Sequence, residues 1–405
     1  MIAGWGPQHR DGLRPVPGGV TAARGFDAVG VTSGVKASGR PDLAVVAGRD
    51  RCAVAAVTTT NLVKASSCRW TDNVAAGGLA RAIVVNSGNA NVCTPDGEAH
   101  TRRMAEATAS LLGAAPEEVV VMSTGVIGVP LPIELIETAL PTAVAALAPD
   151  GGEAAATAIM TTDTRTKQAA FEVTDAAGRR CVVGGMAKGV GMIEPTMATL
   201  LVAITTDAAV PVDALQQVLV SAVNATFNRI SVDGDRSTSD TAVMLANGNG
   251  GEIDLDMLER GVHAVCAELA HMVVADGEGA TRVAGVRVTS AASAADAERI
   301  SRAVATSLLV RAALHGADPN WGRILMAMGN AGVDFDLANI EVTCAGVTVC
   351  RAGVAVPFDA EVASAAMSAE EVEIVIDLGA GDESVTTLTC DLTPEYVSFN
   401  ADYTT

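Results

Sequence analysis

The sequence predicts a layered, mixed α/β fold with a smaller α+β domain at its C-terminal end. Short β-branched runs, bounded by Gly, Asn or charged residues, alternate with helical segments through the first two thirds of the chain. From Ile340 onwards apolar and polar residues alternate, which is typical of half-buried strands. Of the 405 residues 49% are hydrophobic and 3% aromatic, with 40 glycines. We therefore expect a core of small aliphatic side chains.

The individual elements are predicted as follows. The first 20 residues are rich in Pro and Gly, and we expect a loose arm there. Asp213, after Pro211, is the expected N-cap of its helix. A boundary near residue 281 is predicted to separate an α/β domain (1–280) from the α+β domain (281–405). The predicted strands are 42–46, 53–58, 82–85, 119–122, 200–205, 340–344 and 372–378, and the predicted helices are 100–112, 213–227, 254–274 and 295–313.

The charge of the chain excludes some classes of partner. Lys and Arg number 27 and Asp and Glu 47, which gives a formal net charge of −20. Such a surface repels phosphate backbones and anionic lipid, so we expect neither nucleic acid nor a membrane as partner. The sequence has no apolar run of membrane-spanning length and no secretory h-region. We expect a soluble cytoplasmic protein whose eight cysteines are buried, reduced thiols.

Common active-site signatures are missing from the sequence. It contains no G-x-S-x-G elbow, no H-E-x-x-H and no Walker A lysine. His263 and His271 lie two helical turns apart without further ligands, so we predict no metal site. The Gly-rich segment 247–251 is expected to be a surface loop. Ser237 with Asp240 resembles a capping box before the run 241–246.

One segment, AKGVGMIEPTMATLLVAITTDA (187–208), suggests chemistry. A flexible Gly- and Pro-containing loop runs into a buried strand, and Ala198-Thr199 lies at the junction. The Thr199 hydroxyl could attack the carbonyl of Ala198, and water could cleave the resulting ester. The freed α-amine, with an ordinary pKa of about 7.7–8.0, could then take the proton of its own hydroxyl. From the pattern alone, the alternative is an ordinary Thr that begins a strand.

The stretch KGVGMIEPTMATL, Lys188 to Leu200, resembles the cleavage-site motif of the ornithine acetyltransferase family, the glutamate N-acetyltransferases of arginine biosynthesis. The resemblance covers essentially the whole chain. Its other motifs are GVTAARGFDAVGVTSGVK (19–36), VVNSGNANVCT (84–94), MSTGVIG (122–128), FNRISVDGDRSTSDT (227–241), DPNWGRILMAMGNAG (318–332) and SFNADYTT (398–405).

The resemblance implies an N-terminal-nucleophile-type acyltransferase of the ornithine acetyltransferase/DmpA-like fold. Self-cleavage between Ala198 and Thr199 would give an α chain (1–198) and a β chain (199–405), assembled as an α2β2 heterotetramer. Thr199 would be the nucleophile, and Thr124 with Gly125 the oxyanion hole. The implied substrate contacts are Thr161, Lys188, Thr199, Glu278, Asn400 and Thr405; the residues do not decide between Thr161 and Thr162.

The implied reaction is a ping-pong transfer of acetyl from N2-acetyl-L-ornithine to L-glutamate through acetyl-Thr199. No metal and no cofactor is expected, and the sequence leaves open whether acetyl-CoA also serves as acetyl donor. The loop before the cut departs from the family at Glu194 and Thr196. The alternatives are therefore a paralogue of specialised metabolism acting on another N-acyl amino acid, an amidohydrolase or aminopeptidase that passes the acyl group to water, and a non-catalytic binding module.

Overall fold

The computed structural model describes residues 2–7, 10–194 and 200–402, and the chain forms two compact units. Among the described residues, the larger unit holds 10–228 and 235–273, and the smaller unit holds 2–7, 229–234 and 274–402. The chain therefore enters the smaller unit more than once. A single boundary near residue 281 describes only the last of these entries.

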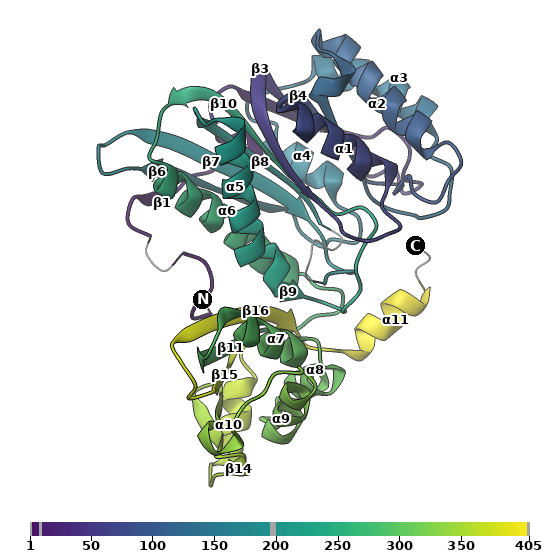
Figure 1. Ribbon diagram of the computed structural model, residues 1–405. Coiled ribbons are helices and arrows are strands. Elements are labelled where there is room, and N and C mark those ends of the chain that lie inside the picture. The colour runs from purple at the N-terminus through teal and green to yellow at the C-terminus, as the bar shows by residue number, and fades with distance from the viewer. Residues whose placement is uncertain (1, 8–9, 195–199, 403–405) are drawn as a thin grey trace. The chain divides into compact units, whose positions relative to one another are not determined.

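The larger unit is built on a nine-stranded sheet with the strand order β1-β6-β7-β8-β10-β3-β4-β5, and with β2 paired to β3 (Figure 1). The pairs β4–β5 and β8–β10 are parallel, and the other pairs are antiparallel. The strands are β1 (Leu13–Pro15), β2 (Phe26–Val31), β3 (Leu43–Thr58), β4 (Leu79–Asn86), β5 (Val119–Ser123), β6 (Lys167–Thr174), β7 (Arg180–Lys188), β8 (Leu201–Ala208) and β10 (Thr241–Gly251).

Strand β3 joins the two halves of this sheet. Its register against β4 shifts between Ala47 and Cys52, where extra residues form a bulge. On either side of that bulge, Val46 and Val54 enter one core cluster with Met122 of β5 and Leu245 of β10. The two halves of the sheet therefore contribute to the same apolar core.

Helices cover the sheet of the larger unit. Helices α5 and α6 lie over the β7–β8–β10 part (Figure 1). Gly185 of β7 allows this close packing, because a Cβ there would lie 3.0 Å from a methyl group of Val265 in α6. The helices are α1 (Ser66–Gly77), α2 (Gly97–Leu112), α3 (Ile133–Ala145), α4 (Gly152–Ile159), α5 (Val212–Ala225) and α6 (Leu255–Ala275), with short 3₁₀ helices η1 (Gly19–Thr21), η2 (Pro116–Glu118) and η3 (Phe227–Arg229).

The smaller unit has a seven-stranded sheet in the order β14-β13-β12-β15-β11-β16-β9. Its core is aliphatic, with Val286 of β11 and Ile374 of β15 packed against Ile300 of α7. The elements are β9 (Ile230–Ser231), β11 (Val283–Ala291), α7 (Ala294–Ala305), α8 (Leu308–His315), α9 (Trp321–Gly329), η4 (Leu337–Asn339), β12 (Glu341–Cys344), β13 (Val347–Arg351), β14 (Val354–Ala355), α10 (Ala360–Met367), β15 (Glu371–Asp377), β16 (Glu383–Cys390) and α11 (Pro394–Asp402).

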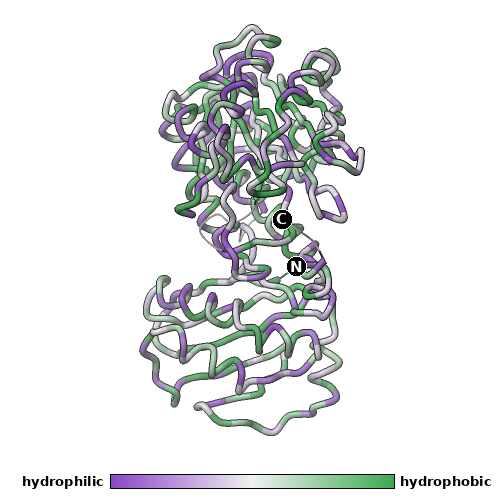
Figure 2. Tube along the Cα trace, turned by 90° about the vertical axis from the view of Figure 1, so that its right-hand side faces the viewer, coloured by the Kyte–Doolittle hydropathy of each residue, from purple (hydrophilic) through white to green (hydrophobic). Residues whose placement is uncertain are grey.

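The mixed α/β fold with two sheets confirms the predicted fold class, and most predicted elements are present. The predicted strands 42–46 and 53–58 are the two ends of β3. Figure 2 shows hydrophobic and hydrophilic residues interleaved along the chain in both units, as alternating buried and exposed positions require.

Four predictions about individual elements are wrong. The predicted helix 295–313 is two helices, because the Ser307 hydroxyl accepts from the Val310 amide and starts α8 anew. Asp213 is not an N-cap, since Pro211 occupies that position in α5. Segment 247–251 continues β10 rather than forming a loop. The run 241–246 is also part of β10, so no helix follows Ser237 and the capping box does not form.

The predicted loose arm is also wrong for its described residues. Ile2 and Trp5 are buried in the smaller unit, where Ile2 lies against Gly285 of β11. In the larger unit, Leu13–Pro15 form β1 and pair with β6. These contacts give the N-terminal residues apolar partners that composition alone could not reveal.

All eight cysteines are free thiols, as predicted, and seven of them are buried. Cys93 is the exception, because its side chain is exposed. Among the described residues, none of the helices is long and apolar enough to cross a membrane.

Candidate active site

The site is built where β7 ends and β8 begins. These strands are antiparallel, and Lys188, the last residue of β7, pairs with Leu201, the first residue of β8. The loop between them closes on itself at this edge of the sheet. Ala198 and Thr199, the predicted cleavage pair, lie outside the described residues, as does Thr405. The described frame therefore shows what surrounds the junction through Leu200 and its neighbours.

Lys188 and Thr124 meet at this edge. The side chain of Lys188 is buried, and its Nζ donates a hydrogen bond to Thr124 Oγ1 at 3.5 Å. Thr124 follows β5, and its backbone amide donates to the carbonyl oxygen of Asn86 at 3.0 Å. A predicted substrate-binding cation and a predicted oxyanion-hole hydroxyl are thus brought together. Because the Thr124 oxygen accepts from Lys188, its own proton is directed elsewhere.

Gly125 can only be glycine in this conformation. Its φ is +132°, in a region that L side chains rarely adopt. A Cβ would lie 2.5 Å from the carbonyl carbon of Gly88 and 2.6 Å from the backbone nitrogen of Asn89. The backbone after β5 therefore passes directly against the loop after β4, which fixes where the Gly125 N–H lies.

Asn86 holds these two loops together. Its Nδ2 donates to the Ser123 hydroxyl at 2.9 Å and to the carbonyl oxygen of Asn89 at 3.0 Å. Its Oδ1 accepts from the backbone amides of Gly88 and Asn89. Asn89 in turn donates to the carbonyl oxygen of Val129. Both asparagines therefore order the loops that carry Thr124 and Gly125.

Asp163 is a central carboxylate that the sequence analysis missed. Its side chain is fully buried, and Oδ1 accepts from Lys167 Nζ at 2.6 Å and from the Gly189 amide at 2.9 Å. Burial raises the pKa of this carboxyl group, but the charges of Lys188 and Lys167 outweigh it and hold the pKa at about 2. Asp163 is therefore ionised and gives the buried Lys188 a counter-charge.

Thr161 is placed on the same carboxylate. Its backbone amide donates to Asp163 Oδ2 at 2.9 Å, and its hydroxyl lies 3.4 Å from the same oxygen. Thr161 follows α4, and so reaches the group around Lys188 from a different element. The structure therefore brings together Thr124, Gly125, Thr161 and Lys188, four of the residues implied by the family resemblance.

A second lysine, Lys36, was also missed. Its Nζ donates to the carbonyl oxygens of Pro41 and Met160 at 2.8 and 2.6 Å. Burial lowers the pKa of Lys36 to about 8, and the neighbouring charge of Lys188 lowers it further, although Asp42 opposes the shift. Positive charge thus gathers at this edge of a strongly acidic chain, as an anionic substrate requires.

Asp240 faces the start of β8. It is fully buried in the loop before β10, and its Oδ1 accepts a hydrogen bond from the Leu200 amide at 2.8 Å. Burial raises the pKa of this carboxyl group well above its usual range, although Lys188 and Arg236 favour the charged form. The sequence signal was present but misinterpreted, since Asp240 precedes a strand rather than a helix.

Glu278 and Asn400 form a separate pair in the smaller unit. Asn400 Nδ2 donates to Glu278 Oε2 at 2.9 Å. Glu278 lies in the turn after α6, and Asn400 lies on α11. The structure therefore brings two of the implied substrate contacts together although 122 positions separate them. Within the described residues, no group of three His, Cys, Asp or Glu side chains is placed to hold a metal ion.

Comparison with known proteins identifies the family. The model of the ArgJ family matches residues 27–405. The chain belongs to the ArgJ family. The Arginine biosynthesis bifunctional protein ArgJ of Thermus thermophilus is 48% identical over 388 residues, which cover 95% of this chain and 100% of that protein. The protein of the same name from Streptomyces coelicolor is 43% identical over 387 residues, covering 95% and 99% of the two chains.

Solved structures of the ArgJ family are also similar to this chain. A crystal structure of Arginine biosynthesis bifunctional protein ArgJ from Bacillus halodurans is 34% identical, covers 49% of this chain and 97% of that chain, and has a TM-score of 0.47. Ornithine Acetyltransferase from Mycobacterium tuberculosis, solved in complex with ornithine, is 41% identical, covers 47% of this chain and 100% of that chain, and has a TM-score of 0.42.

Proposed function

We propose that this ArgJ-family chain is a glutamate N-acetyltransferase of arginine biosynthesis. It would move acetyl from N2-acetyl-L-ornithine to L-glutamate through an acetyl ester on Thr199. The relatives' name and the ornithine bound to one of them support the substrate class. The observation that carries the proposal is the contact between Lys188 Nζ and Thr124 Oγ1 at the edge where β8 begins.

The first step is self-cleavage. The Thr199 Oγ adds to the carbonyl carbon of Ala198, the C–N bond breaks, and the hydroxyl proton moves to the nitrogen. Water then cleaves the ester, leaving a carboxylate on Ala198 and a free hydroxyl and α-amine on Thr199. The Leu200 amide, held by Asp240, fixes the backbone directly after the new N-terminus. We also propose that the two pieces stay together as α2β2 in the cytoplasm.

Acetyl transfer follows in two half-reactions. The α-amine takes the Thr199 hydroxyl proton, and Oγ attacks the acetyl carbonyl of the donor. The Thr124 hydroxyl and the Gly125 N–H stabilise the oxyanion, and ornithine leaves with the proton. The amine of glutamate then attacks the ester and regenerates Thr199. The steps need no metal or further cofactor, and acetyl-CoA could load the same hydroxyl.

Both substrates carry an α-carboxylate, which needs a cation at the site. Lys188 supplies one, and its position beside Thr124 places that charge next to the oxyanion hole. Glu278, paired with Asn400, is the candidate partner for a substrate ammonium group. Thr161 and Thr405 complete the proposed substrate contacts.

Replacement of the nucleophile tests this function. Thr199→Ala is expected to leave one uncut chain with no measurable transfer, whereas Thr138→Ala, an exposed position on α3, is expected to behave as wild type. The measurement is intact mass spectrometry of each protein after incubation with acetylornithine. An uncut wild-type chain, or a cut one without an acetyl adduct on the piece that begins at Thr199, would refute the proposal. Acetate release that does not depend on glutamate would indicate the amidohydrolase instead.

A further inference from the structure

We propose that Asp240 positions the Thr199 nucleophile, with Oδ1 holding the Leu200 amide and Oδ2 receiving the α-amine that self-cleavage releases. This inference rests on the proposed function, because it gives a role at the same nucleophile to a residue outside the substrate contacts and the oxyanion hole. The carboxyl group would act through the amine rather than on the substrate.

Leu200 is fixed on both sides of its peptide unit. Its amide donates to Asp240 Oδ1 at 2.8 Å, and its carbonyl oxygen accepts from the Thr241 amide at 2.8 Å. Asp240 and Thr241 are consecutive residues, so one turn of chain grips both polar groups of Leu200. The residue directly after the nucleophile therefore has a single, well-defined position.

Covalent geometry brings Thr199 close to the same carboxyl group. The carbonyl carbon of Thr199 is bonded to the Leu200 nitrogen that Asp240 holds. Consecutive Cα atoms are about 3.8 Å apart, so the backbone nitrogen of Thr199 cannot be more than one residue's length from that point. Any amine formed at Thr199 consequently appears beside Asp240.

The second carboxyl oxygen is available to this amine. Among the described residues, Asp240 Oδ2 is buried and has no hydrogen-bond partner. The nearby Thr59 hydroxyl donates to the carbonyl oxygen of Ser237 at 2.8 Å. Leaving a buried acceptor unpaired costs about 1–3 kcal/mol. A partner that forms only when the chain is cut would offset this cost in the mature protein.

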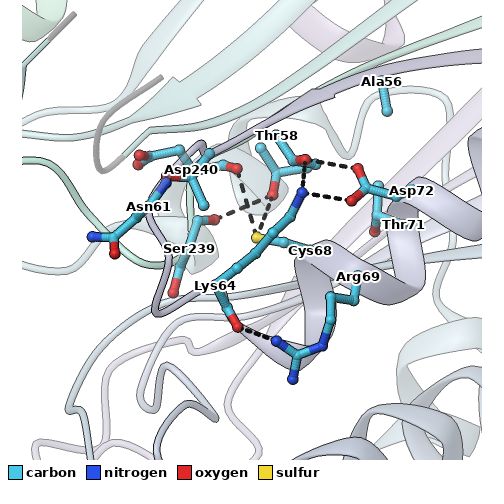
Figure 3. A network of polar contacts seen from close by, with 12 residues as sticks. Ala56, Thr58, Asn61, Lys64, Cys68, Arg69, Thr71, Asp72, Ser239 and Asp240 are labelled. Atoms are coloured by element: carbon cyan, nitrogen blue, oxygen red, sulfur yellow. Dashed lines mark hydrogen bonds and ion pairs between the residues drawn. The ribbon is translucent and has the colours of Figure 1, made fainter. Parts of the chain in front are cut away.

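The loop that carries Asp240 is held firmly by neighbouring elements. Its backbone oxygen accepts from the Thr59 amide at 2.9 Å and lies 3.6 Å from the Cys68 thiol, and the Ala65 amide donates to Thr238. Figure 3 shows Asp240 and Ser239 beside Cys68, at one end of a polar network that continues through Lys64. The carboxyl group is thus fixed before the cut occurs.

The charges balance when Asp240 accepts the amine. During acyl transfer the amine takes the hydroxyl proton and becomes an ammonium, whose charge an ionised Asp240 compensates. The other charged groups acting on this carboxyl are Lys188 at the end of β7 and Arg236 in the loop before β10. Neither makes a hydrogen bond to Asp240 within the described residues, whereas an α-ammonium could do so.

The test compares two isosteric substitutions in buried carboxylates near β8. Asp240→Asn keeps an oxygen for the Leu200 amide but removes the charge, while Asp207→Asn makes the same change at the far end of the strand, where Asp207 binds Arg24. We expect Asp240→Asn to cleave at least tenfold more slowly and, once cut, to shift the acidic limb of the kcat/KM profile to lower pH by roughly one unit. Asp207→Asn should leave cleavage rate and profile unchanged, and Asp240→Glu should restore part of both. Wild-type cleavage rate and profile in Asp240→Asn would overturn the inference.

A crystal structure of the cut wild-type protein decides the matter even if Asp240→Asn does not fold. The Thr199 nitrogen is expected within about 3.2 Å of an Asp240 carboxylate oxygen. A separation beyond about 4 Å would overturn the inference, because no hydrogen bond spans it. If the wild type is cut at Thr199 and transfers acetyl while these tests fail, only the role of Asp240 falls. If the wild type is never cut, the proposed function itself falls.

Discussion

At Gly125 the backbone permits no side chain, and this gives a prediction at the scale of one residue. In Gly125→Ala the new Cβ would meet the backbone of Gly88 and Asn89, so the N–H of residue 125 must move. We expect kcat to fall by about 10²–10³, the typical effect of losing one oxyanion-hole donor. The matched control is Gly128→Ala in the same segment, which has a φ of +77° but no atom within 4 Å of its Cβ. Steady-state kinetics of the two variants provide the measurement; equal losses would contradict this account.

Residue roles could be predicted from the sequence only where a local motif carries them. The segments holding Thr124 and Lys188 were recognised as strings of residues, and the structure brings these two together. Asp163 and Asp240 were missed because their roles depend on partners from distant elements. Asp163 acquires its low pKa from burial next to Lys188, and no spacing in the sequence reveals either condition.

The loops after β4 and β5 act as one element, and Asn86 is the residue that joins them. Asn86→Ala would leave the buried amides of Gly88 and Asn89 and the hydroxyl of Ser123 without this partner. Buried groups left unpaired in this way should lower the free energy of unfolding by about 2–3 kcal/mol. Asn73→Ala, at an exposed position on α1, is the control and should change it by less than about 0.5 kcal/mol. Denaturant unfolding followed by circular dichroism measures both; a wild-type midpoint for Asn86→Ala would contradict the role assigned to it.

Elements with a strong hydrophobic period were predictable, and elements defined by tertiary contacts were not. Helix α6 and strand β15 follow their period closely. The break between α7 and α8 escaped because apolar residues continue across it, and only the Ser307 cap marks it. Strand β10 was misassigned at both ends, since its Gly-rich end and the Asp240 turn resemble a loop and a helix cap.

At the scale of the whole larger unit, the proposed cut falls within a continuous sheet. Strand β7 belongs to the first piece and β8 to the second, yet they pair over six residues, from Val183 with Thr206 to Lys188 with Leu201. A second seam joins β10 to β3. We therefore expect both pieces to elute together in native size-exclusion chromatography and to separate only in denaturant. Separation without denaturant would contradict this arrangement.

The strand order has one more consequence. In the sequence β7-β8-β10-β3, two strands from the second piece are inserted between strands from the first. Neither piece could complete this arrangement if it were made alone, so scission must come after assembly of the intact chain. On the proposed function, the new terminus is therefore an irreversible certificate of correct maturation: a chain that misfolds stays whole, and it stays inert.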